Sequence, residues 1–194
     1  EFARVLGEIG RGVFQITKGA STSIEFIEEL SALSGRPVQV CPMLQDPGRP
    51  ADVFDCMDAY AAATTRGREL YGQVTPFPEI MDFNLREPYP LESLASWQPA
   101  MAASGDEDLM AVFRDLGFRE QVKAELKIAG APFRFSNQWN TMTIQSKAPS
   151  ERGALDKRSI AEMAQAQDKH PLDCMLDLAL SERLETNFTV GMFN

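Results

Sequence analysis

The sequence has few of the side chains that usually hold a transition metal. Its 194 residues include one histidine and three cysteines, Cys41, Cys56 and Cys174, and no Cys-x-x-Cys pair. A structural zinc site needs thiolate or imidazole ligands clustered at short spacing, so we predict no metal site within this chain. An odd number of widely spaced cysteines also argues against a disulfide framework, and it favours a reducing compartment such as the cytoplasm.

Other absences exclude whole classes of function. The apolar runs fall well short of the roughly 20 residues that span a bilayer. Neither Gly-x-Gly-x-x-Gly nor Gly-x-x-x-x-Gly-Lys follows a predicted strand, so nucleotide binding has no support. The formal net charge is −9. That charge argues against nucleic acid or an anionic membrane as a partner, because either would require a basic surface.

The first eighty residues alternate between helical and strand-like patterns. Apolar spacing predicts helices over residues 2–9, from a capping box of Thr22 and Glu25 to Gly35, and over 53–66. Runs rich in β-forming residues predict strands at 12–17, 37–41 and 70–75. Such alternation predicts parallel strands joined by helical crossovers. Spacing alone leaves open whether the sheet is doubly wound or closed into a barrel.

From about residue 81 the alternation stops. We predict helices over 106–115 and 118–129, an extended segment at 137–144, two more helices, and a final strand over 187–192. The last two helices begin at a capping box of Ser159 with Glu162 and at Pro171, which makes His170 an N-cap-region residue. The predicted division is therefore a βα segment at 1–80, a mostly helical insertion at 81–150, and a return to helices plus a strand at 151–194.

Three stretches of the chain carry a family resemblance. They read ARVLGEIGRGVFQ at 3–15 with GRPV at 35–38, SWQP at 96–99 with FRD at 113–115, and RSIAEMA at 158–164 with PLDCMLDL at 171–178. Together they resemble the D-aminoacylase branch of the amidohydrolase superfamily, the N-acyl-D-amino-acid deacylases. The resemblance extends over nearly the whole chain, and its motifs mark the scaffold rather than the chemistry.

The resemblance implies part of a (β/α)₈ TIM-type barrel, about strands five to seven, with a helical insertion. A complete barrel needs about 250 residues, and both ends of the sequence look cut, so we expect an internal piece of a longer chain that is inactive alone. The parent would hydrolyse C–N (amide) bonds of N-acyl amino acids or related substrates with zinc. Its His-x-His pair and catalytic aspartate would lie outside this chain.

The family pattern also places histidines at the ends of strands five and six. This sequence has Ile16-Thr17-Lys18 and Val40-Cys41-Pro42 at those positions. The departure favours an alternative, a barrel relative without metal that acts as a binding or non-hydrolytic protein.

Barrel active sites lie at the carboxyl ends of the strands, which directs attention to the polar residues there. The candidate catalytic residues are Lys18 and Cys41, and the candidate substrate contacts are Thr17, Gln39, Gln73 and Trp97. Each has a structural alternative: a solvated lysine, a cysteine packed as a small hydrophobe, hydrogen-bonded polar groups, or a tryptophan that anchors the insertion. The expected partners are a small amide substrate, the remaining barrel segments, which would cover open sheet edges, and, as a further option, a second copy of the chain.

Overall fold

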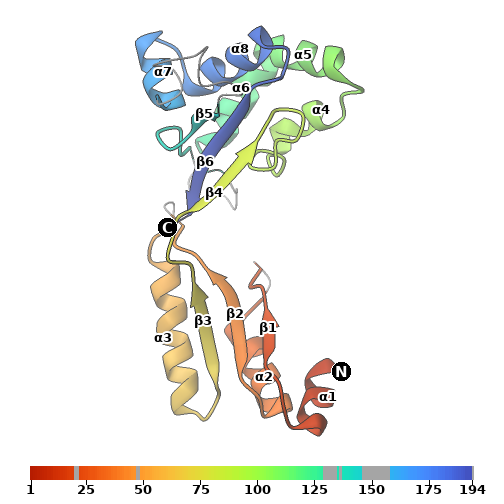
Figure 1. Ribbon diagram of the computed structural model, residues 1–194, viewed down its shortest axis with the longest axis vertical. Helices are drawn as coiled ribbons and strands as arrows, with labels where there is room; N and C mark the ends of the chain where they lie inside the picture. Colours follow the sequence, from red (N-terminus) through yellow and green to blue (C-terminus); the bar gives the residue numbers. More distant parts are fainter. Residues whose placement is uncertain (20–21, 47–48, 129–134, 136, 146–157, 194) are drawn as a thin grey trace. The chain divides into compact units, whose positions relative to one another are not determined.

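The computed structural model describes residues 1–19, 22–46, 49–128, 135, 137–145 and 158–193. These residues form a mixed α/β structure that divides into two compact units (Figure 1). The first unit comprises Glu1–Pro78 with Phe193–Asn194, and the second comprises Glu79–Met192. The division lies beside the boundary predicted at residue 80. The ranges predicted as separate, 81–150 and 151–194, fall almost wholly within the second unit.

The first unit has the predicted alternation of helices and strands. In chain order its elements are α1 (Phe2–Ile9), β1 (Phe14–Ile16), α2 (Ile24–Ser34), β2 (Val38–Met43), α3 (Asp52–Thr65) and β3 (Leu70–Val74). The strands are parallel and lie in the order β1-β2-β3, with Phe14 opposite Val38 and Val38 opposite Leu70. The predicted parallel sheet is confirmed. Within the described residues it is an open sheet of three strands and does not close into a barrel.

One face of this sheet carries the core of the first unit. Alternate strand residues point to the same face, and Val38, Val40 and Leu70 pack there against Ile27 of α2 and Ala63 of α3. Each fully buried aliphatic side chain of this kind contributes about 1.5–3 kcal/mol relative to an exposed one. Both crossover helices therefore cover the same face of the sheet.

Residues with positive φ end the first two helices. Gly10 ends α1 with φ 68°, and Gly35 ends α2 with φ 58°, a conformation that glycine adopts without strain. The predicted start of α2 was wrong by one residue. Ser23 is the N-cap, and its Oγ accepts a hydrogen bond from the Phe26 N–H at 3.2 Å. The Thr22 hydroxyl oxygen instead accepts a hydrogen bond from the backbone N–H of Gly19 at 3.1 Å.

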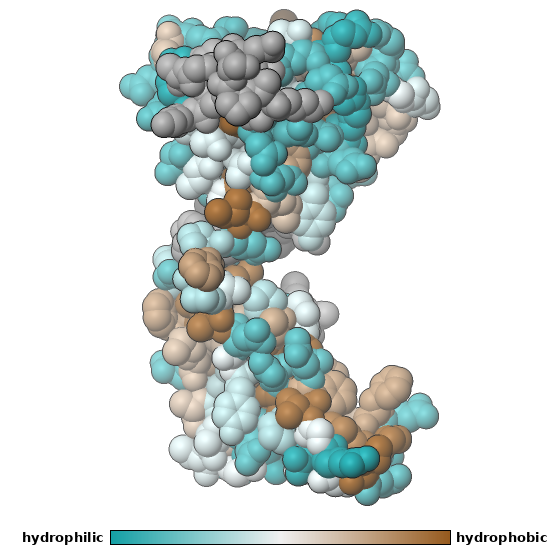
Figure 2. Space-filling model, viewed as in Figure 1, coloured by the Kyte–Doolittle hydropathy of each residue, from teal (hydrophilic) through white to brown (hydrophobic). Residues whose placement is uncertain are grey.

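The apolar stripe that predicts α1 is not buried within the described residues. Phe2, Val5 and Ile9 are 82%, 47% and 57% exposed, while Ala3 is buried. Hydrophobic residues accordingly lie at the surface of the first unit at α1 (Figure 2). Periodicity thus predicted the helix, because it depends only on spacing, but it did not predict what covers the stripe.

The second unit combines helices with a small antiparallel sheet. Its elements are β4 (Glu79–Phe83), η1 (Ala95–Trp97), α4 (Gln98–Met101), α5 (Asp106–Arg114), α6 (Leu116–Leu126), β5 (Thr143–Gln145), α7 (Ile160–Ala166), α8 (Pro171–Ser181) and β6 (Asn187–Phe193). The strands lie in the order β4-β6-β5. The sequence did not predict β4, which follows two prolines and pairs with a strand from the far end of the chain.

Aromatic rings form the centre of the helical layer. The ring centroid of Trp97 lies 5.6 Å from that of Phe113 and 5.4 Å from that of Phe118. Glu125 of α6 supports this arrangement, since its carboxylate accepts the backbone N–H groups of Ala95 and Ser96. Burial would raise the pKa of Glu125, but hydrogen bonds from Ser96 and Ala95 lower it. The short η1–α4 segment is therefore held at its start by a charged acceptor.

Two predicted helix starts in the second unit are confirmed. Ser159 and Glu162 form the capping box of α7, and His170 is the N-cap of α8, where its Nδ1 accepts the Leu172 N–H at 3.1 Å. Among the described residues, no helix combines the length and the apolar character needed to cross a lipid bilayer.

Candidate functional site

Two glutamines from neighbouring strands meet on the face of the first sheet opposite the core. Gln39 of β2 donates a hydrogen bond from Nε2 to Oε1 of Gln73 of β3 at 2.7 Å. Gln39 is half-buried and Gln73 is exposed. Because Val38 and Val40 point into the core, alternation directs Gln39 to the other face. The sequence predicts both glutamines near the carboxyl ends of their strands. Gln73 lies there, but β2 runs from Val38 to Met43, so Gln39 lies near its amino end. The structure nevertheless brings the two side chains together.

The same face carries further side chains in register with the pair. Gln15 of β1 lies opposite Gln39, which in turn lies opposite Tyr71 of β3. Cys41 follows Gln39 by two residues on the same strand and is half-buried. This face of the sheet therefore carries mostly polar side chains that are partly exposed to solvent. The opposite face carries the apolar side chains of the buried core.

Lys18 is directed to a different partner. Its Nζ donates a hydrogen bond to Sγ of Cys56 in α3 at 2.8 Å. Since α3 covers the core face of the sheet, the structure joins Lys18 to a helix thiol and not to the glutamine pair. Thr17 is exposed in the segment after β1. Gln39 and Gln73 are joined to each other by a direct hydrogen bond. Among the described residues, no other two of the predicted strand-end residues are joined in this way.

Cys56 and its neighbour Tyr60 were not predicted as functional residues. They lie one helical turn apart on α3, and Tyr60 is 5% exposed. Within the described part of the chain, the Tyr60 hydroxyl is buried without a hydrogen-bond partner. Burial, reinforced by the nearby Cys56, raises the pKa of Tyr60 to about 12. In the sequence, the apolar stripe of α3 is the one signal for these residues, and it indicates that Tyr60 is a core residue without indicating a function.

The donor set at the strand ends does not fit a zinc ion. Zinc in proteins takes at least three ligands from cysteine, histidine and carboxylate side chains. The described residues contain no group of three such side chains placed to hold a metal. Near the carboxyl ends of β1 and β2 the chain offers the thiol of Cys41 and the carboxylate of Asp46, which is paired with Arg49. These are fewer than the three ligands that zinc requires.

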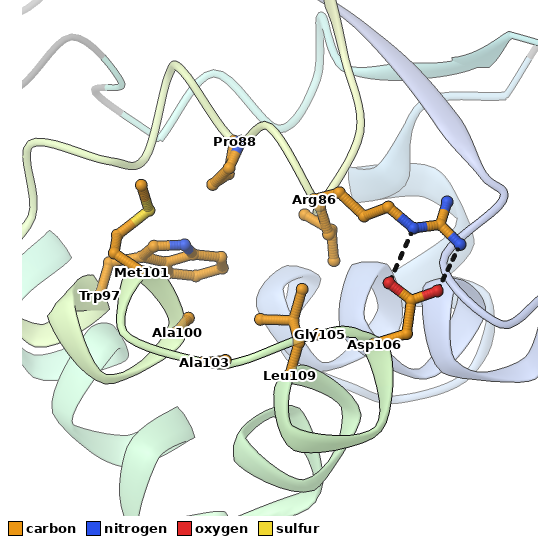
Figure 3. Close-up of a pocket in the computed structure, with 10 residues that line it drawn as sticks. Arg86, Pro88, Trp97, Ala100, Met101, Ala103, Gly105, Asp106 and Leu109 are labelled. Carbon is orange, nitrogen blue, oxygen red and sulfur yellow. Dashed lines mark hydrogen bonds and ion pairs between the residues drawn. The ribbon is translucent and has the colours of Figure 1, made fainter.

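Trp97, a predicted substrate contact, belongs to the second unit. It lines a small cavity of about 190 Å³ together with Leu85, Arg86, Pro88, Ala100, Met101, Ala103, Gly105, Asp106 and Leu109 (Figure 3). Pockets for drug-sized ligands usually measure about 300–1,000 Å³, so this cavity has room for a short apolar group only. Trp97 is fully buried, and its contacts with Phe113 and Phe118 favour an anchoring role. Its contact with a substrate stays a prediction.

The two charged residues that line this cavity, Arg86 and Asp106, are paired with each other. Arg86 forms two hydrogen bonds with the Asp106 carboxylate, at 3.0 and 2.9 Å (Figure 3). It also donates to the backbone carbonyls of Arg183 and Leu184, both of which have positive φ, and to the Glu185 carboxylate. The hydrogen bonds from Arg86 lower the pKa of Asp106, and those to Asp106 and Glu185 raise the pKa of Arg86. Arg86 therefore fixes a backbone turn, and its charge has little capacity left for a ligand.

Comparison of the chain with models of known protein families, with curated proteins and with solved structures finds no match. The similarity to D-aminoacylases consequently stays a prediction from the three sequence stretches.

Proposed function

We propose that this chain forms part of an amidohydrolase-type (β/α) barrel that hydrolyses C–N bonds of N-acyl amino acids or related amides. In this proposal the sheet face with Gln39 and Gln73 contributes to the substrate-binding wall. The observation that supports it best is the arrangement of the first unit. Its strands are parallel and in chain order, α2 and α3 pack on one face, and polar side chains lie on the other. Barrel enzymes likewise have parallel strands with helices on their outer face, and they bind substrate at the carboxyl ends of the strands.

The glutamine pair suits recognition of an amide or a carboxylate. A primary amide has two N–H donors and an oxygen that accepts two hydrogen bonds. The bond between Gln39 and Gln73 uses one donor and one acceptor. The pair therefore retains both kinds of group for a ligand, and the bond between the two amides orients them before the ligand arrives. We assign the pair to substrate orientation and not to proton transfer, because neither side chain titrates.

Zinc enters the proposal only as an ion held elsewhere. The residues at the ends of β1 and β2 do not fit it, so its ligands would come from sequence that completes the barrel. No step of the proposed reaction is assigned to a metal bound by these residues. We also place the protein in the cytoplasm, since Cys41, Cys56 and Cys174 are all unpaired thiols.

A second candidate is a barrel relative that binds a small amide without hydrolysing it. It is favoured by Thr17, Lys18 and Cys41 at positions where the family pattern has histidines. Both candidates use the glutamine pair in the same way, and they differ in whether the bound amide is cleaved.

The test uses the natural full-length protein that contains these residues. Hydrolysis of N-acyl-D- and N-acyl-L-amino acids is measured by amine release, and zinc is measured by elemental analysis. Gln39→Leu should raise KM about tenfold, because one hydrogen bond to a substrate contributes about 1.4 kcal/mol. Gln121→Leu makes the same change at an exposed position of α6 and should leave KM unchanged.

The outcomes separate the two candidates. Hydrolysis with the expected KM effect supports the hydrolase. Saturable binding of an N-acyl amino acid without hydrolysis, weakened by Gln39→Leu, favours the binding protein. If the protein neither cleaves nor binds these amides, both candidates are rejected.

A further inference from the structure

The contact between Lys18 and Cys56 has no role in the proposed function. Lys18 Nζ lies 2.8 Å from Cys56 Sγ, and 38 residues separate the two along the chain. The pair joins the segment after β1 to the middle of α3. An amine nitrogen and a thiol sulfur at this separation are in direct contact, so a bond between them requires little movement of the backbone.

The surroundings allow a small oxidant to reach the thiol. Lys18 is exposed and Cys56 is half-buried, so Sγ lies at the edge of the core and not within it. One helical turn further, the hydroxyl of Tyr60 is buried and has no partner among the described residues. The thiol therefore has an amine nucleophile on its outer side and an unused polar group close to it.

We propose that Lys18 and Cys56 form a covalent S–N cross-link when the protein meets a hydroperoxide. In the first step the Cys56 sulfur attacks the peroxide, an S–O bond forms and the O–O bond breaks. The sulfur loses two electrons and becomes a sulfenic acid, and hydrogen peroxide is reduced to water. The structure assigns Lys18 the second step, because its nitrogen is already in contact with the sulfur.

In the second step the ammonium group of Lys18 gives a proton to water, and the nitrogen lone pair then attacks the sulfenyl sulfur. An S–N bond forms, the S–O bond breaks, and the departing hydroxide takes a proton from the nitrogen and leaves as water. One thiol, one amine and one hydrogen peroxide thus give one sulfenamide and two waters. A sulfenic acid condenses reversibly with a backbone nitrogen to a sulfenamide, and here the Lys18 amine takes the place of the backbone nitrogen. A thiol would restore the starting groups.

The cross-link would tie β1 to α3 and would protect Cys56 from further oxidation. Closing a loop between distant residues reduces the entropy of the unfolded chain, so the first unit should resist unfolding better when oxidised. This inference is independent of the amidohydrolase proposal, since it uses no substrate and no residue of the glutamine pair.

The test treats the full chain with hydrogen peroxide, removes the excess, and digests it with trypsin for mass spectrometry. Trypsin cuts after an unmodified Lys18 but not before Pro37 or Pro50. The cross-link blocks cleavage after Lys18 and should give one peptide of residues 12–66 that is lighter by two hydrogens. Dithiothreitol should restore both the mass and the cleavage.

Three variants make the result specific. Lys18→Arg keeps the cation without a nucleophilic amine, so the cross-link should be lost, and the sulfenic acid of Cys56 should be captured by dimedone several-fold more than in the unaltered chain. Cys41→Ser should still form the cross-link, which separates it from a disulfide between Cys41 and Cys56. Cys56→Ser should abolish it. Normal cleavage after Lys18 in the oxidised chain, with equal dimedone capture in the unaltered chain and Lys18→Arg, would overturn the proposal.

Discussion

At the scale of single residues, Arg119 is the least exposed charged side chain among the described residues of the second unit. Its side chain is 8% exposed. The guanidinium contacts Asp177 at 2.8 Å and Asp173 at 3.3 Å, and its Nε donates to the Phe113 carbonyl at 2.8 Å. Burial would raise the pKa of Asp177, but hydrogen bonds from Lys169 and Arg119 lower it. A buried charge is tolerated only when it is paired in this way.

We therefore predict that Arg119→Met lowers the free energy of unfolding by about 1.5–3 kcal/mol, because it removes the charged hydrogen bonds of a buried guanidinium. Asp173 and Asp177 keep Lys123 and Lys169 as partners, so no buried carboxylate is left unpaired. Arg183→Met is the matched control. Arg183 pairs with Glu107 at 2.8 Å, but both side chains are about three-quarters exposed, so the loss should stay below about 1 kcal/mol. Urea denaturation of both variants checks the prediction, and equal losses would contradict it.

At the scale of elements, the start of α8 depends on the protonation state of one side chain. His170 accepts the Leu172 N–H through Nδ1, so the neutral imidazole is required. Burial lowers the pKa of His170, and the positive charge of Lys123 lowers it further. A histidine whose pKa is lower in the folded state stabilises the fold fully above its unfolded value, near pH 6.5. This contribution is lost as the pH falls through the folded pKa.

The free energy of unfolding should accordingly fall as the pH drops from about 8 towards about 5. His170→Ala should lose about 1 kcal/mol at about pH 8, since it removes the N-cap acceptor, and should show a flatter pH dependence. His170→Asn retains a capping oxygen that does not titrate, so it should keep most of the stability and be equally flat. His170 is the one histidine of the sequence, which makes the assignment direct. An unchanged slope in both variants would refute it.

Elements built by local periodicity were predictable, and elements built by distant partners were not. The alternation over residues 1–74 depends on spacings within each helix or strand, and it gave α1 to β3 with small errors at the ends. By contrast, β4 depends on β6, and Asp82 of β4 accepts a hydrogen bond from Thr189 across 107 residues of sequence. No local pattern records such a partner.

The same distinction applies to the candidate site. Alternation along β2 and β3 predicted that Gln39 and Gln73 face away from the apolar core, and parallel pairing brought them into contact. The predicted position of Gln39 near the carboxyl end of its strand was wrong, because β2 continues to Met43. The contact between Lys18 and Cys56 depends on how α3 packs over the sheet. Sequence spacing specifies which face of a helix is apolar, but it does not specify which loop residue reaches that helix.

At the scale of the whole molecule, each unit contains its own buried core. In the first unit Ile27 and Val38 are fully buried, and in the second Leu172 is fully buried. Both tryptophans, Trp97 and Trp139, are buried in the second unit. Tryptophan fluorescence therefore reports on the second unit alone, while far-ultraviolet circular dichroism reports on helices and strands of both.

Because each core is separate, we predict that the two units unfold independently. Ile27→Ala should destabilise the first unit by about 2–5 kcal/mol through the cavity that it leaves. It should move part of the circular dichroism transition in guanidinium chloride to lower concentration and leave the fluorescence midpoint unchanged. Leu172→Ala, an equally buried aliphatic residue of α8, should instead move the fluorescence midpoint. If Ile27→Ala shifts the fluorescence midpoint as far as Leu172→Ala does, the two units form one cooperative structure and the division into separate cores has no thermodynamic meaning.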